Sequence, residues 1–448
     1  MTHWFLDKIS SWGERPAFVF GDRTVSHTAF AGLARQWSDR LEREGIGAGD
    51  VVGVHGDYSP DSCALVFALA ARRAIVTPLT PLPRETLEAR SATAGANCIV
   101  EMSPDGACRF ERLSPAAAPA LVAKLRGEGA AGLILFSSGS AGKPKACLRN
   151  LDRLLATTRK ERKGYVTLVF LLFDHIGGIN TMINVLGHGG TAVVVADRSV
   201  DTVAAAIEAA GVELLPTSPT FLKMLLISDA ARRFDLSSLK LITYGTEVMA
   251  QATLEGLHRA FPDVALKQTY GLSEIGIVPT RSRAPDSLWM QIGGADVEHK
   301  IIDSILWLRA STAMLGYLDA PSPFDADGWL NTCDKVEVDG GYIRIIGRES
   351  ELINVGGQKV HPAEVENIVL GAGNIRDATV AARSSPVMGS VVVATVSLIE
   401  AEDLGALRSR FDRFCRERLE PYKVPALFKI TDAPLHSARF KKIRAQTA

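Results

Sequence analysis

Several features that would place a protein in a special class are missing from this sequence. Its 50 basic and 50 acidic residues cancel to a formal net charge of zero. There is therefore no overall electrostatic attraction to nucleic acid or to an anionic membrane. Its apolar runs stay shorter than the roughly 18 residues that a membrane-spanning helix needs. The N-terminus lacks the basic start and long apolar core of a signal peptide. The sequence thus predicts no membrane span and no nucleic-acid partner.

Cysteine is also scarce. The six cysteines are scattered along 448 residues, with no Cys-x-x-Cys pair and no dense framework. This pattern is typical of a reduced protein in which most cysteines act as small buried hydrophobes. Together with the missing signal peptide, it predicts a cytoplasmic location.

What the sequence does contain is an alternation of short apolar runs with longer amphipathic stretches. Its length exceeds what one hydrophobic core normally supports, so two or more domains are expected. Strands that alternate with helices favour an α/β architecture with largely parallel sheets. The predicted strands are 51–55, 74–79, 133–136, 166–172, 191–195 and 239–244, and the predicted helices are 61–72, 151–158, 179–186 and 203–210.

The pattern changes from about Asp325 to short, turn-rich strands. Asp339-Gly340-Gly341 is a good hairpin turn, because glycine tolerates positive φ. After Arg348 a smaller unit begins, with a helix at 362–370, strands at 378–382 and 391–398, and a basic helix at 404–419. We predict a large N-terminal domain, 1–348, made of α/β subdomains and a β-rich subdomain. A small mobile α+β C-terminal domain, 349–448, would follow it.

A serine- and glycine-rich segment follows the predicted strand 133–136. Its backbone N–H groups and hydroxyls can approach phosphate oxygens closely, and Lys143 and Lys145 add positive charge. It is not a Walker A loop, because Pro144 follows Lys143 where serine or threonine is needed for Mg²⁺. If the segment is taken alone, the less favoured alternative is a flexible polar surface loop.

The segment 136–145 resembles the phosphate-binding signature of the adenylate-forming superfamily, which includes acyl-CoA synthetases, luciferase-like enzymes and nonribosomal adenylation domains. Further segments carry the resemblance in the expected order over nearly the whole chain. They are 269–274, similar to Tyr-Gly-x-Thr-Glu; 328–334, similar to Gly-Trp-x-x-Thr-Gly-Asp; the hinge-like 347–357; and the tail segments 421–425 and 441–443. Each motif is weak to moderate alone, but together they are very specific.

The resemblance implies an ATP site. Tyr270 would stack on adenine, Ser273 would keep the hydroxyl of the family's threonine, and Asp334 would accept the ribose hydroxyls with help from Arg348. The alternatives are that Asp334 only forms a turn and that Arg348 only makes a surface salt bridge. The residues expected at this site are Ser137, Ser138, Gly139, Ser140, Gly142, Lys143, Lys145, Tyr244, Gly245, Thr269, Tyr270, Gly271, Ser273, Asp334 and Arg348.

The same resemblance assigns the catalytic groups. Glu274 would hold Mg²⁺, a hard cation that prefers carboxylate and phosphate oxygens. Lys442 would stabilise the negative charge that accumulates when a carboxylate approaches the α-phosphorus. Lys441 occupies the position of the family's glycine and is the alternative catalytic lysine, and a solvated tail lysine is the bland alternative. His175 completes the expected catalytic set.

The family's two-domain design implies a mobile small domain, because one site must exclude water and later admit a thiol. Ser350 occupies the hinge position. Gly356 and Gly357 stand where relatives line a pantetheine tunnel, and glycine permits such close approach. The alternative for this pair is an ordinary hairpin turn.

The segment 171–178 resembles the acid-binding segment of acyl-CoA synthetases. In one register His175 gates the acyl site or contacts the substrate carboxylate. In the other, Phe173-Asp174 matches amino-acid-activating relatives, whose aspartate holds the substrate amine. Gly177 and Gly178 favour the His175 register and hence an acid without an α-amino group. The predicted acyl pocket consists of Phe173, His175, Ile176, Gly178, Ser218 and Ile275.

The predicted function is therefore an ATP- and Mg²⁺-dependent ligase that forms an acyl-AMP, releases pyrophosphate and passes the acyl group to a thiol. Coenzyme A is the preferred acceptor, and the phosphopantetheine of an acyl or peptidyl carrier protein is the alternative. A catalytically weakened nucleotide-binding interaction protein is a third interpretation. The retained Lys143, Glu274, Asp334 and Arg348 argue against it.

Overall fold

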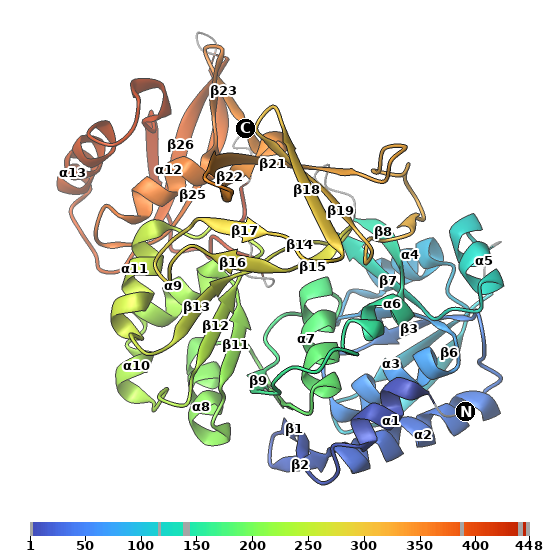
Figure 1. Cartoon of the computed structure of the whole chain (residues 1–448). Helices are drawn as coiled ribbons and strands as arrows, with labels where there is room; N and C mark the ends of the chain where they lie inside the picture. The colour runs from blue at the N-terminus through green and yellow to red at the C-terminus, as the bar shows by residue number, and fades with distance from the viewer. Residues whose placement is uncertain (1–2, 115–117, 138–143, 386–388, 438–441, 445–448) are drawn as a thin grey trace.

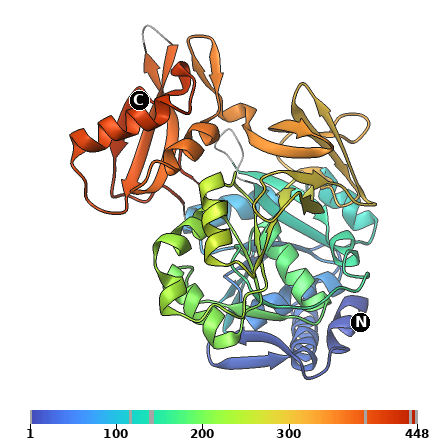
Figure 2. The same ribbon diagram turned by 60° about the vertical axis from the view of Figure 1, so that its left-hand side comes forward.

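The chain folds into a large N-terminal part that carries a smaller C-terminal lobe (Figure 1; Figure 2). The structure is a computed structural model, and it describes residues 3–114, 118–137, 144–385, 389–437 and 442–444. The mixed α/β architecture that the sequence predicts is confirmed.

The first sheet has the strand order β20-β8-β7-β4-β3-β5-β6. Its four central strands are parallel, and the edge strands β6, β8 and β20 run antiparallel to their neighbours. Its strands are β3 (Val51–His55), β4 (Ile75–Leu79), β5 (Cys98–Met102), β6 (Cys108–Arg112), β7 (Gly132–Ser137), β8 (Lys145–Asn150) and β20 (Gly316–Tyr317).

The second sheet has the order β13-β12-β11-β9-β10-β1-β2, and it is parallel except for β2 at one edge. Its strands are β1 (Pro16–Phe20), β2 (Arg23–Ser26), β9 (Val166–Leu168), β10 (Thr191–Val194), β11 (Leu214–Thr217), β12 (Leu241–Tyr244) and β13 (Ala265–Gln268). We predicted that the strand beginning at residue 166 continues to residue 172, but this strand, β9, ends at Leu168. The apolar residues beyond it form a loop toward the site described below.

Helices between these two sheets form the largest core cluster. Helix α3 is buried along nearly its whole length, and a capping box from Ser59 with Pro60 in the first turn fixes its start. The helices between the sheets are α1 (Trp4–Ser10), α2 (His27–Arg43), α3 (Pro60–Ala71), α6 (Leu151–Ala156) and α7 (Ile176–Gly187). The outer helices are α4 (Arg84–Ala94), α5 (Ala120–Gly127), α8 (Val200–Ala210), α9 (Pro219–Ile227), α10 (Ala230–Arg233) and α11 (Gln251–Ala260).

A third, antiparallel sheet lies over one end of the first two, in the order β16-β17-β22-β21-β19-β18 (Figure 1). A separate hairpin, β14–β15, leads into it. The strands are β14 (Tyr270–Leu272), β15 (Gly276–Val278), β16 (Thr280–Ser282), β17 (Met290–Ile292), β18 (Val297–Ile302), β19 (Ile305–Ala310), β21 (Leu330–Asp339) and β22 (Tyr342–Arg348).

The C-terminal lobe has its own sheet and core. The order is β24-β23-β26-β25, with β27 added in parallel to β26. Helices α12 and α13 pack on it, and Ala250 of the large part joins this core cluster. The elements are η1 (Glu349–Glu351), β23 (Ile353–Val355), β24 (Gln358–Val360), α12 (Pro362–Leu370), β25 (Ile375–Ser385), β26 (Gly389–Leu398), α13 (Leu404–Arg416), η2 (Pro421–Lys423) and β27 (Leu427–Ile430).

The third sheet ends at Arg348 and the C-terminal sheet begins at Ile353, so η1 is the connection between them.

No helix within the described residues is long and apolar enough to cross a membrane.

Candidate active site

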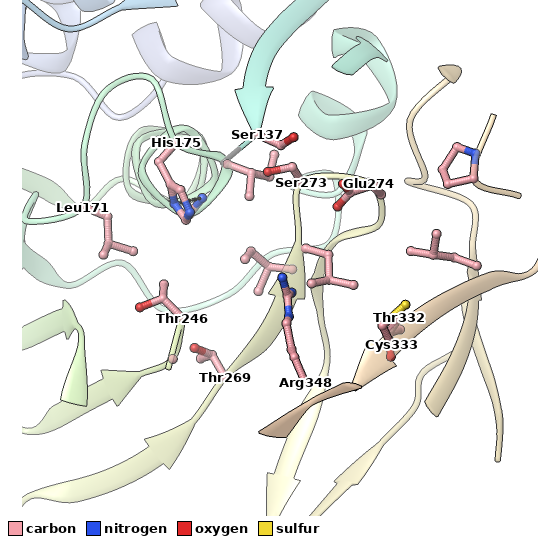
Figure 3. Close-up of a pocket in the computed structure, with 18 of the residues that line it drawn as sticks. Ser137, Leu171, His175, Thr246, Thr269, Ser273, Glu274, Thr332, Cys333 and Arg348 are labelled. Atoms are coloured by element: carbon pink, nitrogen blue, oxygen red, sulfur yellow. Dashed lines mark hydrogen bonds between the residues drawn. The ribbon is translucent and has the colours of Figure 1, made fainter. Parts of the chain in front are cut away.

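A cavity of about 260 Å³ opens where the carboxyl ends of the parallel strands in the second sheet face the third sheet. This is the usual position of ligands in open α/β sheets. Figure 3 shows Leu171 and His175 on one side and Glu274 and Cys333 on the other. A second cavity of about 460 Å³ shares part of its wall. The shared residues are Thr246, Thr269, Gly271, Leu272, Arg348 and Ser350.

The turn that carries Ser273 and Glu274 joins β14 to β15, and a buried arginine supports it. Arg149 on β8 is 1% exposed, and its guanidinium donates hydrogen bonds to the carbonyl oxygens of Ser273, Ile275 (3.1 Å) and Thr312. The Met314 N–H donates to Glu274 O at 2.7 Å. Sequence reasoning missed Arg149, although a charged residue directly after the apolar residues 146–148 of one strand is a signal that could have found it.

Glu274 presents its carboxylate at the cavity wall. Tyr317 donates its hydroxyl to Glu274 Oε1, and the Lys145 ammonium lies 5.0 Å from the centre of the Tyr317 ring. Burial and the hydrogen bond to Glu274 raise the pKa of Tyr317, so the phenol stays a donor. Among the described residues, no group of three or more His, Cys, Asp or Glu side chains forms a metal cage. A single carboxylate fits Mg²⁺, which usually combines one or two carboxylates with substrate phosphates.

Asp334, Tyr270 and Arg348 meet in the wall of the second cavity. Asp334 on β21 stands opposite Arg348 on β22, and Arg348 Nε donates to Asp334 Oδ1 at 2.9 Å. The Tyr270 hydroxyl donates to Asp334 Oδ2. Burial and the Asp334 charge raise the pKa of Tyr270. The three predicted nucleotide residues thus converge. The Tyr270 hydroxyl bonds to one of the two Asp334 oxygens that we expected to accept hydrogen bonds from the ribose hydroxyls.

His175 and Asp174 point in different directions. His175 is the N-cap of α7, and its Nδ1 accepts a hydrogen bond from the Gly177 N–H at 3.1 Å. In the neutral ring the proton therefore sits on Nε2. Asp174 is 2% exposed, and it lies against Thr80 Oγ1 (3.2 Å) and Arg90 (3.6 Å) in the interior. His175 lines the cavity, whereas Asp174 does not.

Of the predicted acyl pocket, the cavity lining includes His175 and Ile176 but not the other four residues. Phe173 and Ile275 are buried in core clusters, and the Ser218 hydroxyl caps α9. A side chain on Gly178 would overlap Leu172 O, so this glycine serves close packing. Lining residues that we did not predict for the acyl pocket include Leu171, Gly177, Pro216, Thr217, Thr243 and Ile277.

The remaining nucleotide predictions divide into three groups. Ser137, Lys145, Gly245, Thr269, Gly271 and Ser273 line the cavity. Tyr244 does not, because it is 1% exposed and its ring packs in the core behind the second sheet. Gly245 also permits a close approach, since a side chain there would meet Thr269 O at 2.8 Å. Ser138, Gly139, Ser140, Gly142 and Lys143 lie outside the described residues.

The C-terminal tail approaches the second cavity. Lys442 lines this second cavity. The Lys442 ammonium, however, donates to Ala378 O at 2.9 Å and lies 3.6 Å from Glu366. Lys441 lies outside the described residues. Ser350 lines both cavities.

Gly356 and Gly357 form the exposed turn between β23 and β24, with φ of 55° and 88°. In the structure the pair therefore forms the hairpin turn that we named as the alternative. Neither glycine lines either of the two cavities.

Comparison with protein families gives two matches. The model of the AMP-binding enzyme matches residues 5–317, and that of the AMP-binding enzyme C-terminal domain matches residues 364–441. An indoleacetate–CoA ligase of Aromatoleum aromaticum is 27% identical over 93% of both chains. A 4-coumarate–CoA ligase-like protein of Oryza sativa subsp. japonica is 30% identical over 86% of this chain and 76% of its own.

Solved structures share the fold. An anthranilate CoA ligase in complex with anthranoyl-AMP superposes with a TM-score of 0.82 at 19% identity, covering 98% of this chain and 95% of its own. An o-succinylbenzoate CoA synthetase from Bacillus subtilis, in complex with its acyl-adenylate intermediate, gives 0.79 at 20% identity. It covers 99% of this chain and 97% of its own.

Proposed function

The chain belongs to the AMP-binding enzyme family and is an ATP-dependent acid–thiol ligase, and we propose that its substrate is a small aromatic carboxylic acid and its acceptor coenzyme A. The orientation of His175 and Asp174 is the observation that carries the substrate class. An α-ammonium group needs an anionic partner in the pocket. The aspartate that could serve is buried against Thr80 and Arg90, so the acid would lack an α-amino group.

The cavity wall supports an aromatic group. Leu171, Ile176, Pro216, Leu272 and Ile277 give it apolar surface, and its volume of about 260 Å³ suits a small acid. Small-molecule sites combine such apolar walls with a few polar groups that fix orientation. The printed names of the relatives point the same way, since indoleacetate, 4-coumarate and anthranilate are all aromatic acids.

The first half-reaction needs two anions held together. A carboxylate oxygen of the acid attacks the α-phosphorus, and the bond to the β-phosphate oxygen breaks to release pyrophosphate. His175 Nε2–H would donate to the acid carboxylate, while Lys145 would face the phosphates. Mg²⁺ held by Glu274 would supply neutralising charge on the phosphates.

The second half-reaction transfers the acyl group. A thiol sulfur attacks the acyl carbonyl carbon, the bond to the AMP phosphate oxygen breaks, and AMP leaves. The CoA ligase names among the relatives support coenzyme A as the thiol. A carrier-protein phosphopantetheine would react in the same way, so the product decides between them.

The test measures acid-dependent pyrophosphate release with ATP and Mg²⁺, and identifies the product by mass with and without coenzyme A. The sharpest pair is 3-phenylpropanoate and phenylalanine, which differ by the α-amino group. We expect at least a hundredfold preference for the acid without the amine. A preference for phenylalanine would refute the assignment of Asp174, and acyl-AMP without acyl-CoA would refute coenzyme A as acceptor.

The catalytic lysine is tested in the same assay. We propose that a tail lysine stabilises the charge on the reacting phosphate, with Lys442 as first candidate and Lys441 as the alternative. Lys442→Ala should lower acyl-AMP formation by orders of magnitude and leave the unfolding transition unchanged. Unchanged adenylation in that variant, with loss in Lys441→Ala, would move the role to Lys441.

A further inference from the structure

One carboxylate outside the predicted site joins the tail to the large part of the chain. Glu247 follows β12 in the wall of the second cavity, beside the proposed nucleotide residues. Its Oε1 accepts the backbone N–H of Lys442 at 2.8 Å. Its Oε2 accepts the Thr220 hydroxyl at 2.6 Å and the Thr220 N–H at 3.3 Å.

The position of Glu247 is fixed from the side of the large part. Thr220 lies in the first turn of α9, where backbone N–H groups have no partner within the helix and favour an anion. Burial raises the pKa of the Glu247 carboxyl, whereas the Thr220 and Lys442 donors oppose that rise. The ionised form therefore depends on these hydrogen bonds, and the carboxylate has little freedom to turn elsewhere.

The tail, in turn, is fixed to the C-terminal lobe by its side chains. Lys442 Nζ donates to Ala378 O, and Arg444 donates to both oxygens of Glu366 at 2.8 Å. Arg444 also pairs with Glu351, just after the predicted hinge residue Ser350. The side chains thus tie the tail to the lobe, and the backbone N–H of Lys442 ties it to the large part.

A nearby apolar contact acts in the same direction. Ala250, three residues after Glu247, is 4% exposed and packs with the core of the C-terminal lobe. The segment 247–250 therefore meets the lobe and its tail through a hydrogen bond to Glu247 and an apolar contact of Ala250. Its carboxylate is the polar part of that interface.

We infer that Glu247 is a positioning residue for the adenylation half-reaction, because it holds the lysine-bearing tail over the nucleotide cavity. This inference rests on the proposed function. It assigns to Glu247 no contact with the reacting atoms. Glu247 would be necessary for acyl-AMP formation and dispensable for the later attack of the thiol. The family's mobile-domain design implies that the lobe is arranged differently during that second step.

Glu247→Gln is the informative variant. Three donors face the two carboxylate oxygens, whereas a glutamine amide has one oxygen and one NH₂ group. Either amide orientation turns NH₂ against a backbone N–H, that of Thr220 or that of Lys442. Glu255→Gln is the matched control, because Glu255 lies exposed on α11 and pairs with the Gln251 side chain.

The experiment separates the two half-reactions. We expect Glu247→Gln to lower the rate constant for pyrophosphate release at least tenfold. Transfer of the acyl group from pre-formed acyl-AMP to coenzyme A should stay within twofold of wild type. Equal losses in both half-reactions, or no loss in either, would overturn the inference. Glu255→Gln should change neither.

A second measurement does not depend on the identity of the acid. Amide hydrogen exchange of the peptide that contains Lys442 reports directly on the hydrogen bond to Glu247. We expect exchange at Lys442 to become at least tenfold faster in Glu247→Gln and to remain as in wild type in Glu255→Gln. Unchanged protection would refute the inference. Absence of pyrophosphate release by wild type would refute the proposed function alone.

Discussion

Replacing Arg149 by methionine tests whether a buried cation holds the turn that carries Glu274. Methionine keeps much of the length of the side chain and removes all of its donors. The carbonyl oxygens of Ser273, Ile275 and Thr312 would each lose a hydrogen bond in a region where water has little access. The turn should then loosen, because its carbonyls must find other partners.

The magnitude follows from two opposing terms. Ile275 O would keep a hydrogen bond from the Thr312 hydroxyl at 3.1 Å, so two carbonyls, those of Ser273 and Thr312, lose their partner. Each buried carbonyl left unsatisfied costs about 1–3 kcal/mol, so the two together cost about 2–6 kcal/mol. Burial lowers the pKa of Arg149 well below its usual value, to about 10. That shift corresponds to about 3 kcal/mol against the buried charge, which the variant regains. The net loss should therefore be about 1 kcal/mol in the free energy of unfolding of the large part.

Denaturant unfolding of Arg149→Met, followed by intrinsic fluorescence, measures this loss. Arg153→Met is the control, because Arg153 is exposed on α6 and its removal should change stability by less than about 0.5 kcal/mol. Pyrophosphate release should fall at least tenfold in Arg149→Met, since Glu274 no longer has a fixed position. Wild-type stability together with wild-type activity would refute the reasoning.

Three further predictions concern other residues. Glu274→Gln should lower pyrophosphate release by about a hundredfold without unfolding the protein, because the amide oxygen can still accept from Tyr317; activity within threefold of wild type would contradict a metal-holding role. Cys333 is exposed on the cavity wall, so ATP with Mg²⁺ should slow its alkylation, and Cys333→Ala gives the background; equal labelling rates with and without nucleotide would contradict the proposed ATP position. Burial and three nearby lysines lower the pKa of His361 from 6.5 to about 4. The stabilising contribution of neutral His361 is therefore complete above pH 6.5 and lost as the pH falls through 4. Between pH 6.5 and 4, the free energy of unfolding of wild type should fall by about 3 kcal/mol more than that of His361→Gln. Identical pH profiles of the two proteins would refute this.

The sequence predicted the site best where a residue belongs to an ordered motif. Tyr270, Asp334 and Arg348 lie far apart in the chain and converge on one cavity wall, as the resemblance implied. It did less well with the acyl pocket. Ser218 and Ile275 directly follow lining residues in the chain, and Phe173 lies two positions from one, but side chains close together in the chain often point to different faces. Proximity in sequence therefore does not predict which of them reaches the cavity.

The sequence by itself determined the α/β architecture, the AMP-binding family and the chemistry of acid activation, because these depend on local patterns and on the order of motifs. Only the tertiary structure decided what each polar side chain faces. It turned Asp174 inward and His175 into the cavity, and it placed Arg149 under the Glu274 turn. It also brought Glu247 to a backbone N–H almost two hundred positions away. Such contacts depend on how distant elements pack, and no local pattern in the chain specifies that packing.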